Sequence, residues 1–430
     1  MFTDRMNLGF PRALRFGALC LVAALSVGLA ACGGGGGGGG GSAATNGGSG
    51  SNTTASLPAP PSEQPIAATA ANTVPVTVGT GLAGAPNIPT VSVTVCVPNT
   101  TTCQTVDNIQ VDTASFGLRI LSSALSTVGG SLPGATVSGG SLAECMTFAD
   151  SYTWGSVRNA DVKIGGETAS NIPVQVIGDI TSAPAPAACT HVGVADNTPH
   201  DLGANGILGI GVAPWDCGAG CANNVSGNYY YACSGSSCAN TPVATAQQVA
   251  NPIARFATDN NGAIVQMQPI SYDGAPSAGG TLVFGINTES NNALNASENF
   301  ATTAWGDLSS TFNGQSLTAF LDSGSNALFF NDSSLPLCSG NESRFYCPPA
   351  SQYLSATLTG TNGASGGASF AVANASTLFA SGNYAFNDLA GQFGSSSDLD
   401  LGLPFFYGRY VYVGQDTTAR GGTQAPFVAF

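Results

Sequence analysis

The chain is poor in positive charge. Among 430 residues there is a single lysine, Lys163, and only 8% of all residues are charged, with 24 acids against 10 bases. Nucleic-acid binding needs a basic face, and docking on anionic lipid needs clustered basic residues, so the composition argues against both kinds of partner. A surface with so few charges must be covered largely by Ser, Thr, Asn and Gly, which suits an exported β-rich protein.

Histidine is almost as rare. His191 and His200 are the only two, and neither an H-E-x-x-H motif nor an acidic cluster accompanies them. We therefore interpret both as loop residues and expect no metal and no cofactor. A G-x-S-x-G pattern occurs at residues 363–367. The serine-hydrolase arrangement that uses this pattern needs a histidine later in the chain, and both histidines come earlier, so we set that reading aside.

The N-terminus resembles an export signal. Three arginines accompany an apolar stretch, Phe16–Leu29, that is too short to be read as a spanning helix. Small residues before Cys32 resemble the signal of a bacterial lipoprotein. That resemblance implies cleavage of residues 1–31 and acylation of the Cys32 thiol. Because Gly33 follows, rather than an acid, it implies a lipid anchor in the cell envelope at the outer membrane; a plain signal peptide cleaved near Ala31 is the alternative.

A low-complexity segment separates this leader from the rest of the chain. It begins with Gly33–Gly41 and continues with Ser, Asn, Thr, Ala and Pro. Such a composition cannot bury enough apolar surface to order itself. We expect residues 32–74 to form a flexible tether.

Ten cysteines remain beyond Cys20 and Cys32, and an even number in an exported chain implies disulfides. The spacing suggests the pairs Cys96–Cys103, Cys338–Cys347 and, over a longer loop, Cys145–Cys189. The four cysteines between positions 217 and 238 form one cluster whose pairing stays open. A zinc site is the alternative for that cluster.

Strand patterns dominate the remaining sequence. The segment Thr90–Val97, TVSVTVCV, alternates with a period of two, and similar short runs recur up to the C-terminus between Gly, Asn and Ser. Thr245–Ala257 is the best helical stretch, although Pro252 interrupts it. We expect an all-β body with few short helices. Its size exceeds one comfortable core, so two lobes are predicted, residues 75–262 and 263–430.

Two acidic motifs share one layout. Asp112 lies in VDTASFGL and Asp322 lies in FLDSGSNALFF, each between apolar runs and each followed by a hydroxyl residue, a small residue and a serine. Two carboxyls brought within hydrogen-bonding distance cannot both ionise cheaply. The charged one can take a proton from water, while the protonated one polarises an amide carbonyl. The duplicated motif therefore predicts a pair of acids contributed by two lobes.

With these motifs the chain resembles the pepsin-like aspartic proteases. Residues 205–211, NGILGIG, and 400–413, DLGLPFFYGRYVYV, resemble the segments that cross behind the two catalytic loops of that family. Residues 279–286 resemble the strand that opens the second half, and residues 147–166 match the flap hairpin. The resemblance covers residues 75–430 and implies a mainly β, two-lobed architecture with six-stranded, barrel-like lobes. A lipoprotein leader on this fold also resembles bacterial lipoproteins of uncharacterised function.

The resemblance implies roles for individual residues. Asp112 and Asp322 would form the catalytic dyad. The residues that would brace its two loops are Thr113, Ser115, Ser323, Gly324 and Ser325. The flap would present Phe148, Tyr152 and Trp154. Two positions depart from the family pattern, since Ala114 replaces a glycine and Phe148 replaces the flap tyrosine. We interpret Arg119 as a surface or ion-paired residue, with substrate contact as the alternative.

Together these features predict a membrane-anchored aspartic endopeptidase. It would act as a monomer on an extended peptide or protein substrate, with water activated by the dyad. The alternative is a catalytically inactive pepsin-like envelope lipoprotein that serves as a binding or scaffolding module. Ala114 and Phe148 motivate that alternative, because a shared fold does not imply a shared activity.

Overall fold

The computed structural model describes residues 57–137 and 139–430. The predicted signal peptide, the lipid-anchor residue Cys32 and most of the predicted tether lie outside the described residues. Within the described ranges, no helix is long and apolar enough to cross a membrane.

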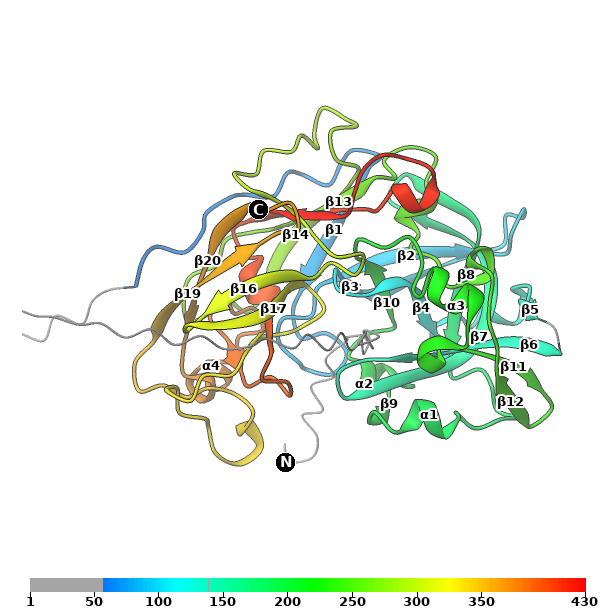
Figure 1. Cartoon of the computed structure of the whole chain (residues 1–430), viewed down its shortest axis with the longest axis horizontal. Coiled ribbons are helices and arrows are strands. Elements are labelled where there is room, and N and C mark those ends of the chain that lie inside the picture. Colours follow the sequence, from blue (N-terminus) through cyan, green and yellow to red (C-terminus); the bar gives the residue numbers. More distant parts are fainter. Residues whose placement is uncertain (1–56, 138) are drawn as a thin grey trace, which may run out of the picture.

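Strands are the main regular elements of the described residues and lie in two lobes (Figure 1). The first lobe contains β2 (Thr90–Cys96), β3 (Cys103–Asp112), β4 (Phe116–Leu121), β5 (Thr136–Val137), β6 (Gly140–Thr147), β7 (Ser151–Ile164), β8 (Glu167–Ile177), β9 (Val194–Ala195), β10 (Gly206–Ile210), β11 (Tyr230–Ser234) and β12 (Ser237–Asn240). The second contains β16 (Leu308–Phe312), β17 (Gln315–Asp322), β18 (Leu328–Phe329), β19 (Gln352–Thr359), β20 (Ser365–Val372), β21 (Ala390–Gly391) and β22 (Asp398–Gly402). The α-helices are short: α1 (Ala187–Thr190), α2 (Pro199–Leu202), α3 (Ala219–Asn223) and α4 (Ala375–Ala380). The expected all-β, two-lobed architecture is confirmed.

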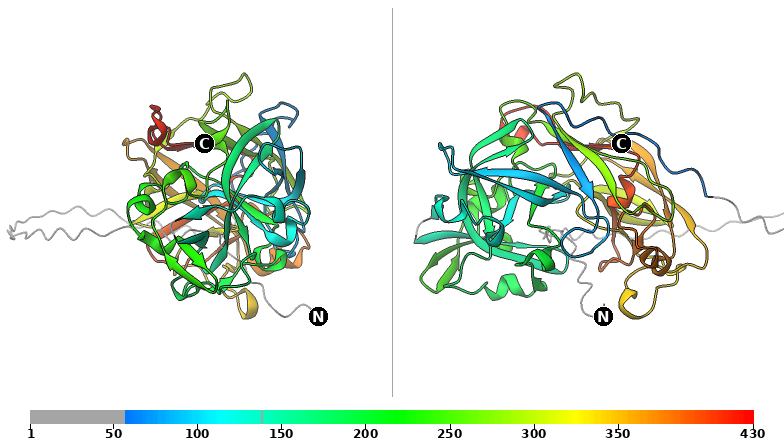
Figure 2. Two further views of the ribbon diagram at one scale, coloured as in Figure 1. Left: turned by 90° about the vertical axis from the view of Figure 1, so that its right-hand side faces the viewer. Right: turned by 180° about the vertical axis from the view of Figure 1, so that it is seen from behind.

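A shared sheet joins the lobes. Its strands are β1 (Thr73–Val78), β14 (Ala278–Phe284), β13 (Gly262–Met267), β23 (Tyr410–Gly414), β24 (Phe427–Ala429) and β15 (Asn299–Ala301), each paired with the next. Figure 2 shows β1, in blue, beside a strand of the second half when the molecule is seen from behind. The expected lobe boundary at residue 262 therefore falls at the start of β13, within a sheet that both halves of the chain build.

The strand β2 shows why the alternating pattern folds this way. Val91, Val93 and Val95 are buried on one face, whereas Ser92 between them is exposed and donates to Asp107 Oδ1 at 2.6 Å. A period of two places alternate side chains on opposite faces of a strand. The strand predicted from this pattern is confirmed.

The helix expected over Thr245–Ala257 is wrong. The segment forms only two 3₁₀ turns, Thr245–Gln247 and Ile253–Arg255. Between them the backbone bonds outward instead, with Ala250 N donating to the carbonyl of Pro173 and Asn251 N to that of Pro214. Pro252 has no N–H and disfavours helical geometry in the residue before it, so tertiary hydrogen bonds override the helical composition.

The tether predicted to reach residue 74 is too long. Residues 57–72 lie against the body: Glu63 N donates to Gly408 O at 2.9 Å, and Ile66 N donates to Gln266 Oε1 at 2.9 Å. Several prolines between residues 58 and 65 restrict the unfolded chain, which lowers the entropy cost of docking this segment.

Five disulfides link the described residues. The three pairings predicted from spacing are confirmed, Cys96–Cys103, Cys145–Cys189 and Cys338–Cys347. The open cluster resolves into Cys217–Cys221 and Cys233–Cys238. All four of its sulfurs are therefore in disulfides, and the zinc alternative is excluded for them.

Candidate active site

Each acidic motif ends a strand that is crossed by a second segment in the same way. In the first lobe β10 runs parallel to β3, with Gly209 opposite Asp112. In the second lobe β22 runs parallel to β17, with Gly402 opposite Asp322. The two aspartates therefore occupy equivalent positions in two copies of one local structure.

Close backbone approach explains the glycine in each crossing segment. A Cβ atom on Gly402 would lie 2.0 Å from the carbonyl oxygen of Ala327, and one on Gly209 would lie 2.6 Å from the nitrogen of Phe116. Any larger residue at either position would push the crossing strand away from the aspartate loop.

A β-bulge interrupts the pairing of β2 with β3 shortly before β3 reaches Asp112. The pairing of β2 and β3 shifts register between Val91 and Val93, and Asn108 takes a positive φ of 58°. Asn tolerates that region better than most residues do. Asn205, just before β10, donates from its backbone to Asn108 O and from its side chain to Asp107 O, at 2.8 and 2.9 Å. These bonds hold the start of the crossing strand beside the bulge.

Hydrogen bonds link the two aspartate loops in both directions. Thr113 Oγ1 donates to the carbonyl of Leu321 at 2.8 Å, and Ser323 Oγ donates to that of Val111 at 2.7 Å. The backbone N–H of Ser323 also donates to Thr113 Oγ1 at 2.9 Å. These buried bonds contribute about 1 kcal/mol each. They place Thr113 and Ser323 where the brace was expected.

Asp112 is held by its own loop. Its Oδ1 accepts from the backbone N–H groups of Ala114 and Ser115 at 2.8 and 3.1 Å, and its Oδ2 accepts from the Ser115 hydroxyl. The backbone of Ala114 does not take a positive φ. The methyl group of Ala114 therefore leaves the N–H contact to Asp112 intact.

Asp322 is held in the same way. Its Oδ1 accepts from the N–H groups of Gly324 and Ser325 at 2.8 and 3.2 Å, and its Oδ2 accepts from the Ser325 hydroxyl at 2.9 Å. The two carboxyls thus have matching sets of donors.

The carboxyls of Asp112 and Asp322 meet within hydrogen-bonding range, and neither residue is exposed. Burial raises the pKa of Asp112, although the hydroxyl of Ser115 and the loop N–H groups lower it in part. Burial also raises the pKa of Asp322 well above its usual range, and the charge of Asp112 adds to that shift. The pair therefore keeps one proton to a higher pH than an isolated aspartate would, and Asp322 holds it in preference to Asp112.

Comparison with known proteins adds a family. A family model described as "Protein of unknown function (DUF3443)" matches residues 68–430. The chain belongs to this family. Among solved structures, the crystal structure of the aspartic proteinase from Irpex lacteus is similar, with a TM-score of 0.49 and 17% sequence identity over 84% of this chain and 97% of that one. No curated protein matches the sequence.

In the DUF3443 chain the three expected flap residues lie in or beside apolar clusters of the β6–β7 hairpin. Phe148 is fully buried in a cluster with Met146 and Leu121, on one face of the β6–β7 hairpin. Trp154 packs on the other face, with its ring 5.5 Å from that of Tyr231. Tyr152, half-buried, adjoins the same cluster as Trp154. The missing hydroxyl of Phe148 is thus a core substitution.

The segment between β8 and β10 also holds the hairpin in place. The strand β9 pairs with β7 beside the hairpin turn, and Cys189 joins it to Cys145 of β6. From the turn itself, Asp150 Oδ2 lies 3.2 Å from Arg344 Nη1 of the second lobe. Because both side chains of that ion pair are substantially exposed, it contributes less than about 1 kcal/mol.

A second set of charges lies buried behind the first aspartate loop. Arg119 has no exposed surface, and its Nη2 lies 2.6 Å from Glu144 Oε1 and 3.2 Å from Asp216 Oδ2. Its Nη1 donates to the carbonyl of Phe116, the first residue of β4. Arg119 is therefore ion-paired, and the surface position expected for it is wrong because its two acidic partners are buried with it.

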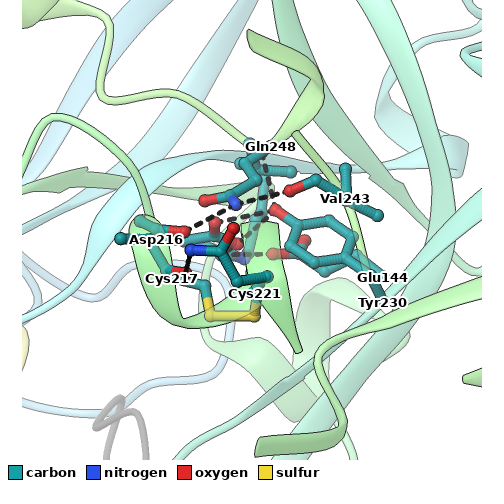
Figure 3. The surroundings of a disulfide bond; sticks show 12 residues. Glu144, Asp216, Cys217, Cys221, Tyr230, Val243 and Gln248 are labelled. Carbon is teal, nitrogen blue, oxygen red and sulfur yellow. Dashed lines mark hydrogen bonds and ion pairs between the residues drawn. A yellow bond between two sulfur atoms is a disulfide. The ribbon is translucent and has the colours of Figure 1, made fainter. Parts of the chain in front are cut away.

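The partners of Arg119 gather around a disulfide. Figure 3 shows Asp216, Glu144 and Tyr230 beside the Cys217–Cys221 bond. The Tyr230 hydroxyl lies 2.7 Å from both carboxylate oxygens of Asp216. Burial raises the pKa of Asp216 well above its usual range, the charge of Glu144 raises it further, and Arg119 lowers it. The cluster thus holds the start of β4, and with it the end of the Asp112 loop.

The sequence reading missed one residue of the site. Asp400 is buried in β22, and its Oδ2 lies 2.7 Å from the hydroxyl of Ser325. A signal was present: this acid interrupts the apolar run of the crossing segment, where the first lobe has Ile207.

Proposed function

We propose that the protein is an aspartic endopeptidase. The observation that carries this proposal is the meeting of Asp112 and Asp322, two buried acids at equivalent strand ends whose loops are hydrogen-bonded to each other. A pair that retains one proton supplies a base and an acid at the same place.

The roles in hydrolysis follow from the proton distribution. The carboxylate of Asp112 takes a proton from a water molecule, and the water oxygen forms a bond to the substrate carbonyl carbon. Asp322 gives its proton to the carbonyl oxygen as that oxygen becomes negative. The tetrahedral carbon then collapses: the C–N bond breaks, the amide nitrogen leaves with the proton that Asp112 took up, and one hydroxyl of the carbon returns its proton to Asp322 as the new carbonyl forms. Asp112 ends as the carboxylate and Asp322 ends protonated, so the pair is back in its starting state.

The burial of the dyad favours an extended substrate. Asp112 and Asp322 have no exposed surface, so a folded protein cannot present a peptide bond to them. An extended segment would enter beside the turn of the β6–β7 hairpin, which contacts the second lobe through the ion pair of Asp150 with Arg344. Breaking this exposed ion pair by itself costs less than about 1 kcal/mol.

The location proposed for the enzyme is the bacterial cell envelope, with a lipid on Cys32 and residues 33–56 as the tether. The leader pattern supports this, and the docked segment from residue 57 fixes where the body begins. We expect Cys32→Ser to move the protein from the membrane fraction to the soluble fraction without loss of folding, because one thioether-linked diacylglycerol supplies the membrane affinity. Membrane association unchanged in this variant would contradict the anchor.

Hydrolysis can be tested directly. The purified protein, incubated with a denatured protein at pH values from 3 to 7, should release peptides that mass spectrometry detects. The rate should be highest on the acidic side and fall where the dyad loses its proton. A pepstatin-type inhibitor, which places a hydroxyl between the two carboxyls, should block it. Absence of cleavage at every pH would overturn the proposal.

If no cleavage is found, the protein would be the catalytically inactive binding or scaffolding module that the sequence analysis gave as the alternative. Its first motive was Ala114, yet the N–H of this residue reaches Asp112 as the N–H of Gly324 reaches Asp322. Its second motive was Phe148, which lies in the core of the hairpin. Neither departure from the family pattern favours loss of catalysis.

A further inference from the structure

The two lobes differ at one position of the crossing segments. In β22, two residues before the glycine that faces Asp322, Asp400 lies opposite Phe320. The equivalent residue of β10, two before the glycine that faces Asp112, is Ile207. An otherwise duplicated structure therefore has a buried carboxyl on one side and an aliphatic side chain on the other.

A single hydroxyl joins this carboxyl to the dyad. Ser325 Oγ lies 2.9 Å from Asp322 Oδ2 and 2.7 Å from Asp400 Oδ2. A serine hydroxyl carries one proton and can donate it to only one of two carboxylate oxygens. The other contact is a hydrogen bond only if one of the carboxyls is protonated and donates to Oγ.

The same count applies to the contact within the dyad. Two carboxyls in hydrogen-bonding range need one proton between them, so Asp112, Asp322 and Asp400 together need two. Two carboxylates that face each other in a buried site without a shared proton would repel each other, which adds to the cost of burial.

The charges that act on Asp322 are all negative. Within the described residues, Asp112 and Asp400 are the charged groups that raise the pKa of Asp322, after burial itself. The strand β18 packs against β22 with Phe329 opposite Asp400, and the other acid of β22 is Asp398.

We propose that Asp400 is a positioning residue of the catalytic centre, a third acid that shares a second proton with Asp322 through the Ser325 hydroxyl. This inference rests on the proposed function. When the pH rises and Asp400 gives up its proton, its negative charge holds the remaining proton on Asp322. The dyad therefore keeps its acid closer to neutral pH than two carboxyls alone would, which suits an enzyme in the cell envelope.

The pH profile of kcat/KM tests this role. We expect Asp400→Asn to move the alkaline limb of the profile to lower pH, so that at a pH on that limb kcat/KM, taken relative to each protein's own maximum, falls by about tenfold or more. Asp398→Asn is the matched control, because it removes an acid from the same strand without the bond to Ser325, and it should follow the parent profile. Superimposable profiles for the parent and D400N, or a uniform loss at every pH, would overturn the proposal.

A second measurement does not depend on turnover. The slope of unfolding free energy against pH reports the difference in bound protons between the folded and unfolded states. Between pH 5 and 7 we expect the folded D400N variant to retain about one proton fewer than the parent. Stability of the parent should therefore fall more steeply with rising pH. Equal slopes would contradict the third acid even if the protein proved not to be a protease.

A second variant at position 400 tests whether the effects of D400N come from a folding defect, because it takes the residue found at the equivalent position of the first lobe. Asp400→Ile reproduces the arrangement seen at Ile207 and should show the same two effects as D400N. An active parent with unchanged variants refutes only the third acid. An inactive parent refutes the proposed function. In that case the slope of unfolding free energy against pH still tests whether Asp400 holds a proton.

Discussion

Asp112→Asn should lower kcat/KM on a denatured protein substrate by at least about 1000-fold. The asparagine side chain preserves the shape of the site and can still accept from the N–H groups of Ala114 and Ser115. It cannot take a proton from water, so the attacking oxygen is no longer activated. General-base catalysis contributes about 10² to 10⁴ in rate, and residues that act as one unit lose more than a single step suggests.

Two further variants separate catalysis from folding. Asp322→Asn should be as inactive as D112N, and the double variant should be no worse than either single one, because both acids serve the same proton transfers. The unfolding free energy of each should stay close to that of the parent. If D112N retained more than about a tenth of the parent activity while D322N did not, the two acids would not act as a pair.

Arg119→Met should be the most destabilising single change in the first lobe, by about 3–5 kcal/mol at neutral pH. The methionine fills a similar volume but leaves Glu144 and Asp216 buried without their cation. Removal of one member of a buried ion cluster costs more than the cluster itself contributes, because the remaining charge stays desolvated. A loss of this size is a large part of the total stability of a domain. Denaturant unfolding at pH 7 would measure it.

The loss should shrink at low pH. Without the guanidinium, the pKa of Asp216, already raised by burial and by Glu144, rises further. A raised pKa in the folded state means that stability is greatest below the pKa of the unfolded chain and falls as the pH rises. The difference between R119M and the parent should thus be small near pH 3 and largest above neutrality.

A matched control uses the exposed pair. Arg344 lies 3.2 Å from Asp150, the same distance as Arg119 from Asp216, but the Arg344 side chain is 68% exposed. Arg344→Met should therefore change the unfolding free energy by less than about 1 kcal/mol. Equal losses for the two arginine variants, or a loss in R119M that does not depend on pH, would contradict the buried cluster.

The parts of the site that short sequence patterns encode could be predicted. An aspartate at the end of an apolar strand, a following hydroxyl and a later apolar-apolar-glycine segment each have a local cause. The glycine is required because no Cβ fits at Gly209 or Gly402. Two copies of that arrangement, separated by about the length of one lobe, predicted the pair Asp112 and Asp322. They also predicted that Thr113 and Ser323 brace the two loops.

The parts that depend on distant partners could not be predicted. The burial of Arg119 is one such part, because its partners Glu144 and Asp216 lie far from it in the sequence and nothing local indicates that the three residues meet. Thr245–Ala257 has helical composition, yet hydrogen bonds to Pro173 and Pro214 hold it in another conformation. In each case long-range contacts outweigh the local preference.

The central claim is that Asp112 and Asp322 share one proton, and carboxyl titration by ¹³C NMR of aspartate-labelled protein measures this most directly. The account predicts two well-separated titration steps that both resonances report, the upper one far above the usual range of aspartate, with D322N leaving Asp112 a single step. Two carboxyls that titrate independently in the ordinary range, unchanged by replacement of the other, would contradict it.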